Sequence, residues 1–193
     1  MQELKYALKV FSYVIPIGIT FSTTLYTVKK VDGVSMQPTF NPQSRVDDDD
    51  RLLRTENRAS HKPFSDIVLL NRWVTRNFDL RVGDVVACKS VRDPRQSLIK
   101  RVIGLEGDWI RSLPSYDEDI VEVPKGYCWL EGDYKERSLD SNHFGPVPLG
   151  MVVGRADAII WPPKRWSLVR RELDDETFQR IKVPISPLPM VKE

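Results

Sequence analysis

Two patterns of apolar and polar positions divide the chain. Residues 10–28 form a stretch of 19 residues without a charge, whereas the chain after Lys30 consists of short apolar runs between polar turns. A helix over 10–28 would be about 28 Å long, close to the ~30 Å hydrocarbon core of a bilayer. Lys9 precedes the stretch, Lys29 and Lys30 follow it, and tyrosines lie near both ends, as at membrane interfaces. The pattern predicts a single membrane-spanning anchor.

Two other interpretations of residues 10–28 stay open. The stretch could be a buried core helix, or a signal peptide that is removed. It is longer than a usual signal-peptide core, and no clean A-x-A site follows it, so an uncleaved anchor is favoured. Two lysines lie on each side, so the positive-inside rule gives no orientation.

The remainder of the chain reads as an all-β body. Runs of four to eight residues rich in Val, Ile and aromatic side chains are separated by clusters of Gly, Pro, Asp and Asn, which is the pattern of short strands joined by turns. The predicted strands are 28–34, 66–72, 84–90, 97–104, 108–112, 119–123, 127–131 and 151–161.

Two segments differ from this pattern. Residues 43–65 are dense in charge and include four consecutive aspartates at 47–50, which predicts a long, solvated and mobile loop; the alternating spacing of a calcium loop is missing. Residues 164–182 could form an amphipathic helix, and 183–193 contain three prolines and should be extended. We therefore expect an anchor over 1–30, a β domain over 31–166 and a helix with a proline-rich tail over 167–193.

Composition narrows the classes of function. The 193 residues carry a net charge of +2, which argues against a nucleic-acid-binding protein, and 41% are hydrophobic, which excludes wholesale disorder. Two cysteines and two histidines exclude a disulfide scaffold and a four-cysteine zinc site, and leave little for a histidine-rich metal site. We expect neither a metal nor a cofactor. Cys88 and Cys128 are expected to be free. The mean hydropathy of −0.35 averages over the uncharged stretch and the polar body.

One serine is a candidate nucleophile. Ser35 follows Gly33 at the end of a predicted strand, where its hydroxyl can be exposed and its own N–H can lie near a reacting carbonyl. A serine nucleophile needs a base. His61 lies in the charged loop and His143 in a turn-like run, so both are interpreted as surface residues.

Lysine is the alternative base, provided that burial lowers its pKa far enough for it to be neutral. Eleven of the twelve lysines lie near the anchor, in loops, at strand ends or in the tail. Lys100 lies inside a strand and shares a face with Leu98 and Val102 by alternation, while Arg101 faces the other way. From the residues alone, a lysine that extends from a sheet edge to solvent is the competing interpretation.

These residues together resemble the ordered boxes of the type I signal peptidases. The boxes are SMQPT at 35–39, GDVV at 83–86, KRVIGLEGD at 100–108, and EGD at 131–133 followed by SLDSN at 138–142. The resemblance spans roughly residues 8–165 and includes the anchor. The runs DSNHFGPV at 140–147 and WPPKRW at 161–166 are most similar to the mitochondrial inner membrane proteases of this family.

The resemblance implies a fold, an activity and roles for individual residues. It implies an antiparallel, signal-peptidase-like β body with an N-terminal transmembrane helix and a short C-terminal helix. Ser35 would be the nucleophile and Lys100 the general base. Ser138 would orient the lysine and Asp140 would support the site. The peptide at Gly33 would contribute backbone N–H groups near the oxyanion, and Val34 and Met36 would line shallow substrate pockets.

Two positions depart from the bacterial pattern. Bacterial members often carry a serine at the position of Gly33, and an arginine, paired with the aspartate, at the position of Asn142. We therefore expect a hydrogen bond at most between Asn142 and Asp140.

The resemblance also implies partners and a location. The substrates would be precursor proteins with cleavable sorting peptides, and a heterodimer with a related protease subunit is expected, in contact with a lipid bilayer. The location would be the mitochondrial inner membrane, with a single span and the catalytic domain in the intermembrane space.

Two rival functions remain. The chain could be a non-catalytic anchored subunit that stabilises a partner protease, in which case Ser35→Ala would leave processing intact. It could also be a soluble, self-cleaving Ser–Lys protein of the repressor type, against which the stretch 10–28 argues.

Overall fold

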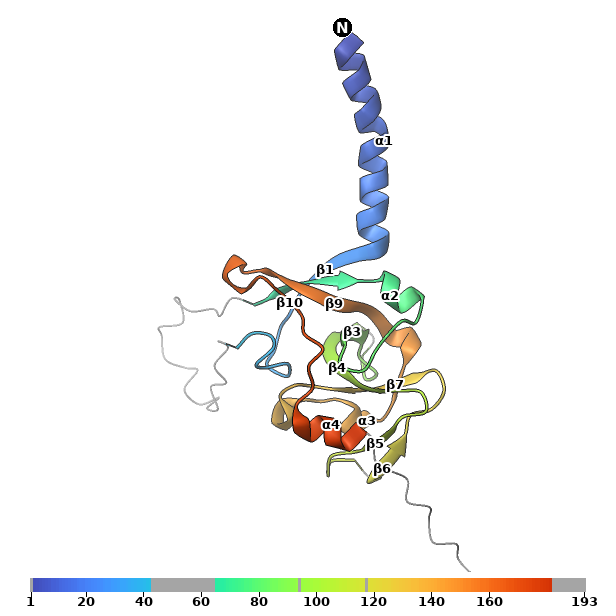
Figure 1. Ribbon diagram of the computed structural model, residues 1–193, viewed down its shortest axis with the longest axis vertical. Helices are drawn as coiled ribbons and strands as arrows, with labels where there is room; N and C mark the ends of the chain where they lie inside the picture. Colours follow the sequence, from blue (N-terminus) through green and yellow to red (C-terminus); the bar gives the residue numbers. More distant parts are fainter. Residues whose placement is uncertain (1, 43–64, 94, 117, 182–193) are drawn as a thin grey trace, which may run out of the picture.

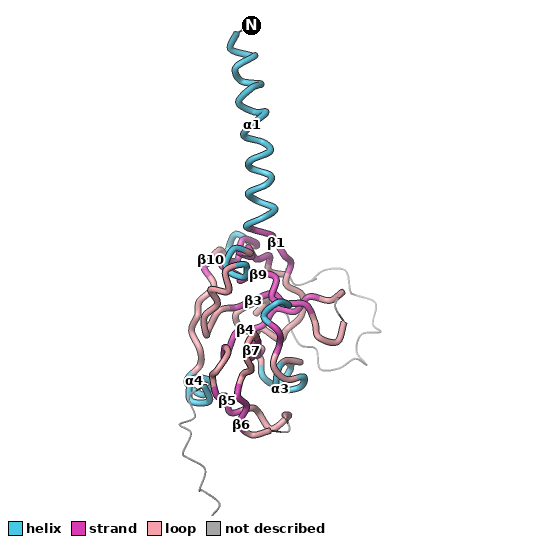
Figure 2. Tube along the Cα trace, turned by 90° about the vertical axis from the view of Figure 1, so that its right-hand side faces the viewer, coloured by secondary structure: helices cyan, strands magenta, loops and turns pink. Residues whose placement is uncertain are grey.

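A long helix stands apart from a compact β body in the computed structural model, which describes residues 2–42, 65–93, 95–116 and 118–181 (Figure 1). Helix α1 (Gln2–Leu25) projects away from the body in two perpendicular views (Figure 2), and side chains such as Phe11 and Ile15 on it are exposed. Across the described ranges, no helix is both long enough and apolar enough to cross a membrane. The predicted helix over this stretch is confirmed, while its passage through a membrane is not.

The body is built on one antiparallel sheet, as the resemblance to the signal peptidases implies. Its strands follow the order β1-β2-β9-β3-β4-β7-β8, and β10 pairs with β9. Two further strands, β5 and β6, form a separate antiparallel pair. The bounds are β1 Tyr26–Lys30, β2 Ile67–Asn71, β3 Val85–Lys89, β4 Ser97–Leu105, β5 Trp109–Arg111, β6 Ile120–Glu122, β7 Tyr127–Glu131, β8 Val147–Pro148, β9 Val152–Trp161 and β10 Ser167–Leu168.

The sheet is strongly curled. Three strands separate β1 from β4 in the sheet order, yet Lys29 Nζ of β1 donates a hydrogen bond of 2.9 Å to Ser97 Oγ of β4. A twisted sheet can bring strands that are distant in order together only by coiling on itself. The curl encloses most of the buried apolar residues and leaves a gap between the end of β1 and the start of β4.

Short helices lie between the strands and after the last one. The bounds are α2 Trp73–Arg76, α3 Ser141–Phe144 and α4 Asp175–Ile181, with 3-10 turns at Lys135–Arg137, Leu149–Met151 and Pro163–Arg165. In Figure 1, α4 lies at the end of the body remote from α1, beside β5. The first and last described helices, α1 and α4, therefore lie at opposite ends of the body.

Two predicted elements are shorter than expected. The strand predicted over 28–34 ends at Lys30, because the chain turns at Gly33, whose φ of +95° does not continue a strand. The helix predicted over 164–182 is wrong in extent. Ser167 and Leu168 pair with Ile159 and Ala158 as β10, and only Asp175–Ile181 is helical. Ser167 and Leu168 form backbone pairs with β9, and such long-range pairing cannot be seen from the local spacing of apolar residues.

Some expectations fall on parts of the chain that the structure does not describe. They are the mobile loop, apart from Ser65, with its four aspartates and His61, and the extended proline-rich tail.

Candidate active site

Lys100 lies in the middle of β4 with almost no exposed surface. Its exposed fraction is 2%, and its strand neighbours Val86 and Val102 are fully buried. Burial lowers the pKa of Lys100 from its ordinary value of 10.5, and the charges of Asp140, Cys88 and Asp133 act in the opposite direction. Within the described ranges no carboxylate lies within ion-pair distance of its Nζ atom, which donates to Ser138 Oγ at 3.1 Å. The arrangement favours a neutral amine.

Ser138 links this lysine to a buried carboxylate. The Ser138 hydroxyl donates to Asp140 Oδ2, and the backbone N–H of Gly132 donates to the same oxygen at 2.9 Å. The other oxygen, Oδ1, accepts from the backbone N–H and the side-chain amide of Asn142 at 3.1 and 3.2 Å. The hydrogen bond expected in place of a bacterial ion pair is therefore present. Because the Ser138 proton is directed at Asp140, its oxygen lone pairs are free to accept from Lys100.

Ser35 lies in a turn that follows β1 and is half-buried. Its carbonyl accepts from the backbone N–H of Tyr134 at 3.0 Å. Gly132 fits closely into the same place: a Cβ at that position would lie 2.5 Å from the Ser35 carbonyl oxygen and would also collide with the Ser138 hydroxyl. The turn that carries Ser35 and the hydroxyl that accepts from Lys100 thus meet at Gly132.

Ser35 and Lys100 lie near each other, on either side of Ser138 and Gly132. Neither residue forms a hydrogen bond with the other among the described residues, since the Lys100 amine donates to Ser138. Nucleophile and base often stand further apart in a ligand-free site than in the complex with substrate. The structure brings Ser35, Lys100, Ser138 and Asp140 to one place, and their catalytic roles stay predictions.

A cavity of about 130 Å³ borders Ser35. One wall is formed by the end of β1 and the chain that follows it, including Gly33. The other wall is formed by the start of β4, residues 97–99. Gly33 takes φ +95°, a conformation that favours glycine, and its carbonyl accepts from Asn41 Nδ2 at 3.1 Å. A serine at this position would be strained.

The two residues predicted to line substrate pockets differ in position. Met36 is 2% exposed, packs in the core with Phe40 and Val85, and also lines the cavity. Val34 is half-buried and does not line the cavity. Only Met36 is therefore placed where a bound side chain could contact it.

Sequence reasoning missed the residues that hold the Ser35 turn from outside. The amide of Asn41 donates to the carbonyls of Val31 and Gly33, and Asn41 exchanges hydrogen bonds with Asp66 at 2.8 and 2.7 Å. Asp66 also accepts from Arg165 Nε at 3.0 Å. Asn41, Asp66 and Arg165 are far apart in the sequence, so no local spacing indicated that they interact.

A second support lies on the opposite face of β4. Arg101 forms a bidentate ion pair with Asp133, with both N–O distances at 2.7 Å, and also donates to Gly83 O and Arg170 O. The alternation that places Lys100 inside one face predicts that Arg101 faces the other way, which is confirmed. Arg101 and Asp133 both lie in the motifs at 100–108 and 131–133, but the sequence did not indicate that they pair.

The remaining candidate groups do not join the site. Cys88 and Cys128 are buried and free, as expected, and burial raises the pKa of their thiols to about 11 and about 12. His143 is exposed, with Nδ1 3.8 Å from Asp140 Oδ1. Among the residues the structure describes, no group of three or more His, Cys, Asp and Glu side chains could hold a metal ion.

Comparisons with known proteins show the family to which the chain belongs. The family described as "Signal peptidase, peptidase S26" matches residues 4–113 and 110–161. The chain is 43% identical to "Mitochondrial inner membrane protease subunit 2" of Danio rerio over 82% of this chain and 77% of that protein. It is 39% identical to "Mitochondrial inner membrane protease subunit 1" of Mus musculus over 59% of this chain and 70% of that protein. The crystal structure of a signal peptidase I from Enterococcus faecalis V583 matches at 24% identity with a TM-score of 0.35, covering 39% of this chain and 95% of that one. The chain belongs to the signal peptidase family S26 and is a signal-peptidase-type serine protease.

Proposed function

We propose that this chain removes sorting peptides from proteins directed to the mitochondrial intermembrane space, with Ser35 as nucleophile and Lys100 as general base. The observation that carries the proposal is the Lys100 amine: it is buried, its pKa is lowered by burial, and its hydrogen bond to Ser138 places it beside the turn that bears Ser35. A lysine whose pKa is lowered in this way is neutral at lower pH than an exposed lysine, and only the neutral amine can accept a proton.

The chemistry follows from these groups. Ser35 Oγ attacks the scissile carbonyl carbon while neutral Lys100 takes its proton, and a tetrahedral oxyanion forms. Collapse of this intermediate breaks the C–N bond, and the ammonium of Lys100 protonates the leaving amine. Water, deprotonated by Lys100, then attacks the acyl-enzyme and releases the peptide and the Ser35 hydroxyl. Backbone N–H groups around Ser35 stabilise the oxyanion, and a single such donor is typically worth ~3–4 kcal/mol.

Ser138 and Asp140 act as orienting groups in this scheme. The Asp140 carboxylate fixes the Ser138 hydroxyl proton, and the Ser138 oxygen fixes the Lys100 amine. The hydrogen bond from Asn142 replaces a counter-charge at Asp140 and keeps this carboxylate in place.

The substrate would bind as an extended strand in the gap of the curled sheet. β1 pairs only with β2 within the described sheet, and the first residues of β4 pair only with β3, so each offers a free edge to the cavity beside Ser35. Main-chain hydrogen bonds to such edges hold a peptide in register, and alternate side chains enter pockets. A cavity of about 130 Å³ with Met36 in its wall fits small side chains next to the cut.

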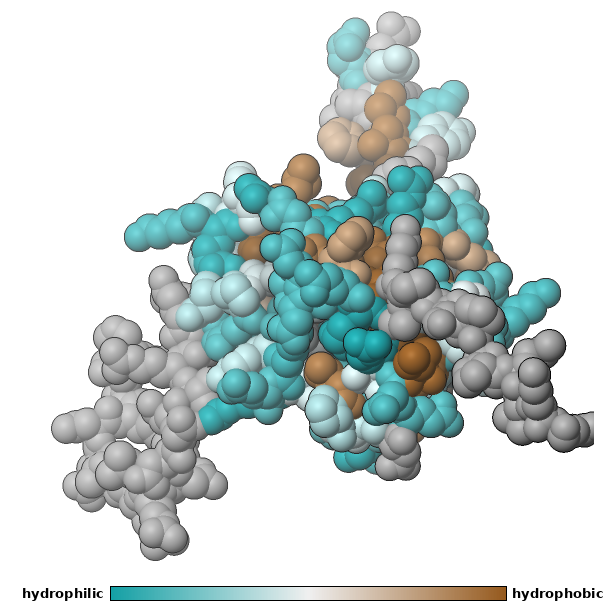
Figure 3. Space-filling model, turned by 60° about the horizontal axis from the view of Figure 1, so that its bottom comes forward, coloured by the Kyte–Doolittle hydropathy of each residue, from teal (hydrophilic) through white to brown (hydrophobic). Residues whose placement is uncertain are grey.

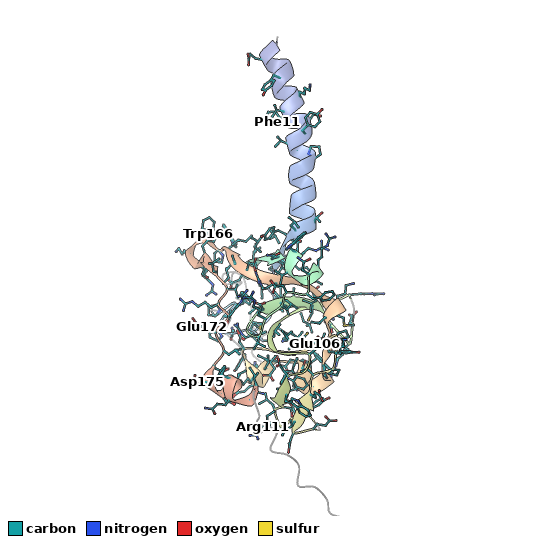
Figure 4. All side chains as sticks on the ribbon, turned by 45° about the vertical axis from the view of Figure 1, so that its right-hand side comes forward. Phe11, Glu106, Arg111, Trp166, Glu172 and Asp175 are labelled. Carbon is teal, nitrogen blue, oxygen red and sulfur yellow. The ribbon has the colours of Figure 1, made fainter. Side chains whose placement is uncertain are left out.

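Attachment to the mitochondrial inner membrane, with one span and the catalytic domain in the intermembrane space, is part of the proposal. Relatives bear the name of mitochondrial inner membrane proteases. Helix α1 carries exposed apolar side chains between Val10 and Ile15, and Trp166 lies exposed at the end of the body from which α1 leaves (Figure 4). Aromatic rings of this kind prefer the membrane interface.

A related protease subunit is the proposed partner. Relatives are named as subunit 1 and subunit 2 of one kind of protease, and this chain is similar to both. We propose a heterodimer in which this chain and a subunit 1-like chain each contribute a body of the same family.

Precursor processing in membranes tests the proposal. We expect Ser35→Ala and Lys100→Arg each to lower processing of this chain's precursors by at least ~10³-fold, since arginine stays protonated at working pH. Glu106→Gln, a change on an exposed turn, serves as the control with unchanged activity. Full processing by Ser35→Ala would show that the chain is a non-catalytic subunit, and full processing by Lys100→Arg would exclude lysine as the base.

A further inference from the structure

The last residue of β7, Glu131, is a buried carboxylate directly before Gly132 of the candidate site. Glu131 is 2% exposed, and its two oxygens accept from Arg180 Nη1 at 3.1 Å and Nη2 at 2.6 Å. The indole N–H of Trp129 donates to the same carboxylate at 2.9 Å. This bidentate pair joins two segments that are 49 residues apart in the chain.

Arg180 belongs to the short helix α4, which is docked at the end of the body away from α1. Arg180 also donates to the carbonyl of Arg111 at 3.1 Å, and Ile181 packs in the core with Ile110 and Trp129. Figure 4 places Arg111 and Asp175 together at this end. Seen from below, the face is mostly hydrophilic, with small separate apolar areas (Figure 3). The buried residues of α4 are Thr177, Arg180 and Ile181, and of these Arg180 brings a charge into the body.

The carboxylate of Glu131 is one residue from the groups that position the site. Gly132, the next residue, donates to Asp140 and leaves no room between the Ser35 carbonyl and the Ser138 hydroxyl. Tyr134, two residues further, donates to the Ser35 carbonyl. A shift of the end of β7 would thus move both the Ser35 turn and the Ser138–Asp140 pair.

We propose that Arg180 is a positioning residue: by clamping Glu131 from α4, it holds Gly132 in the place where Ser35 meets Ser138. The inference rests on the proposed roles of Ser35 and Lys100. A buried ion pair adds little stability compared with apolar side chains of the same volume, so what this pair contributes is position. Two ion pairs from Lys135, to Asp174 and to Glu176, are partly exposed and contribute little. The buried pair of Arg101 with Asp133 holds the residue after Gly132 from β4, while Glu131 before it is held from α4.

Removal of Arg180 should affect turnover more than binding. A methionine at 180 leaves the Glu131 carboxylate buried without a counter-charge, which is strongly unfavourable, so the end of β7 moves to bring that carboxylate to water. The Ser35 turn then loses its fixed distance to the base. Most of the cavity wall, residues 29–33 and 97–99, forms no hydrogen bond with Arg180 in the part of the chain that the structure describes, so we expect peptide binding to change less than turnover.

The test uses the full chain in detergent micelles with a precursor peptide. We expect Arg180→Met to lower kcat by about 10- to 100-fold with KM changed less than twofold. We expect the double variant Arg180→Met with Glu131→Gln to restore the folded fraction but not kcat, because a neutral amide needs no counter-charge yet nothing ties it to α4. Glu176→Gln, on the exposed side of the same helix, is the matched control and should match the parent protein. If Arg180→Met does not fold, Arg180→Lys is measured in the same way.

Hydrogen exchange separates this inference from the proposed function. Faster exchange of the Gly132 and Tyr134 amides in Arg180→Met is expected whether or not Ser35 and Lys100 catalyse, and activity in Ser35→Ala would overturn the dyad alone. Unchanged kcat and unchanged exchange in Arg180→Met would overturn the positioning role. So would recovery of kcat in the double variant, since the fall in Arg180→Met would then come from the unpaired carboxylate alone.

Discussion

The Lys100 amine lies 3.1 Å from the hydroxyl oxygen of Ser138, at the end of a polar chain that continues to Asp140. The order of donors in this chain is fixed, because the Asp140 carboxylate accepts from the serine. The serine oxygen can then only accept from the lysine. This single relationship explains how an amine that is 2% exposed keeps a defined direction without an ion pair.

The Ser138 hydroxyl should be needed for turnover more than for folding. We expect Ser138→Ala to lower kcat by roughly 10²-fold, within the range of a misplaced general base, since the amine loses its fixed direction. Ser167→Ala, at an exposed hydroxyl of β10, is the control. A steady-state assay with a precursor peptide measures the effect, and an unchanged kcat in Ser138→Ala would contradict the orienting role.

The pH dependence should report the lowered pKa of Lys100. The base acts when neutral, so kcat/KM should rise with pH and reach its plateau below the ordinary lysine value of 10.5. The charge of Asp140 raises the pKa of Lys100, so Asp140→Asn should move the midpoint of this rise to lower pH. It should also lower the plateau, because the Ser138 hydroxyl is held less well. A midpoint that moves to higher pH in Asp140→Asn would be inconsistent with this electrostatic coupling.

Gly132 should tolerate no side chain. We expect Gly132→Ala to lower activity by at least ~100-fold, because its Cβ would lie 2.5 Å from the Ser35 carbonyl and would collide with the Ser138 hydroxyl. Gly150→Ala is the matched control, since a Cβ there meets nothing within 4 Å. Activity per folded protein, with folding monitored by circular dichroism, gives the comparison. Equal activity in the two variants would show that the turn and the hydroxyl do not depend on this close approach.

Replacing the buried lysine should stabilise the fold while removing activity. The folded-state pKa of Lys100 is lowered, so its charge destabilises the folded protein fully below that pKa, and the effect vanishes as pH rises past the unfolded value. Lys100→Met should therefore raise the denaturant midpoint at neutral pH, and the gain should shrink towards pH 10.5. Chemical unfolding at several pH values measures this, and a loss of stability at neutral pH would show that the charged amine is well accommodated.

Local pattern was sufficient for most of the β body. Strands 66–72, 84–90, 97–104 and 127–131 match β2, β3, β4 and β7, because their alternating apolar residues have only one way to be buried. The first strand was predicted too long and the C-terminal helix far too long. In both cases the decisive influence was not local: a turn at Gly33 in one, and pairing of β10 with β9 in the other.

The sequence alone also identified Lys100, since a lysine inside an apolar strand has to be buried or to extend from an edge, and it identified Ser35 through its turn and through family resemblance. It could not reveal that Asn41 and Asp66 anchor the Ser35 turn, or that Arg180 binds Glu131 across 49 residues. Alternation along a strand determines which side chains share a face, because that depends only on backbone geometry. Which of those faces meet, and which buried charge finds which partner, depends on how the sheet curls, and only the tertiary structure decides that.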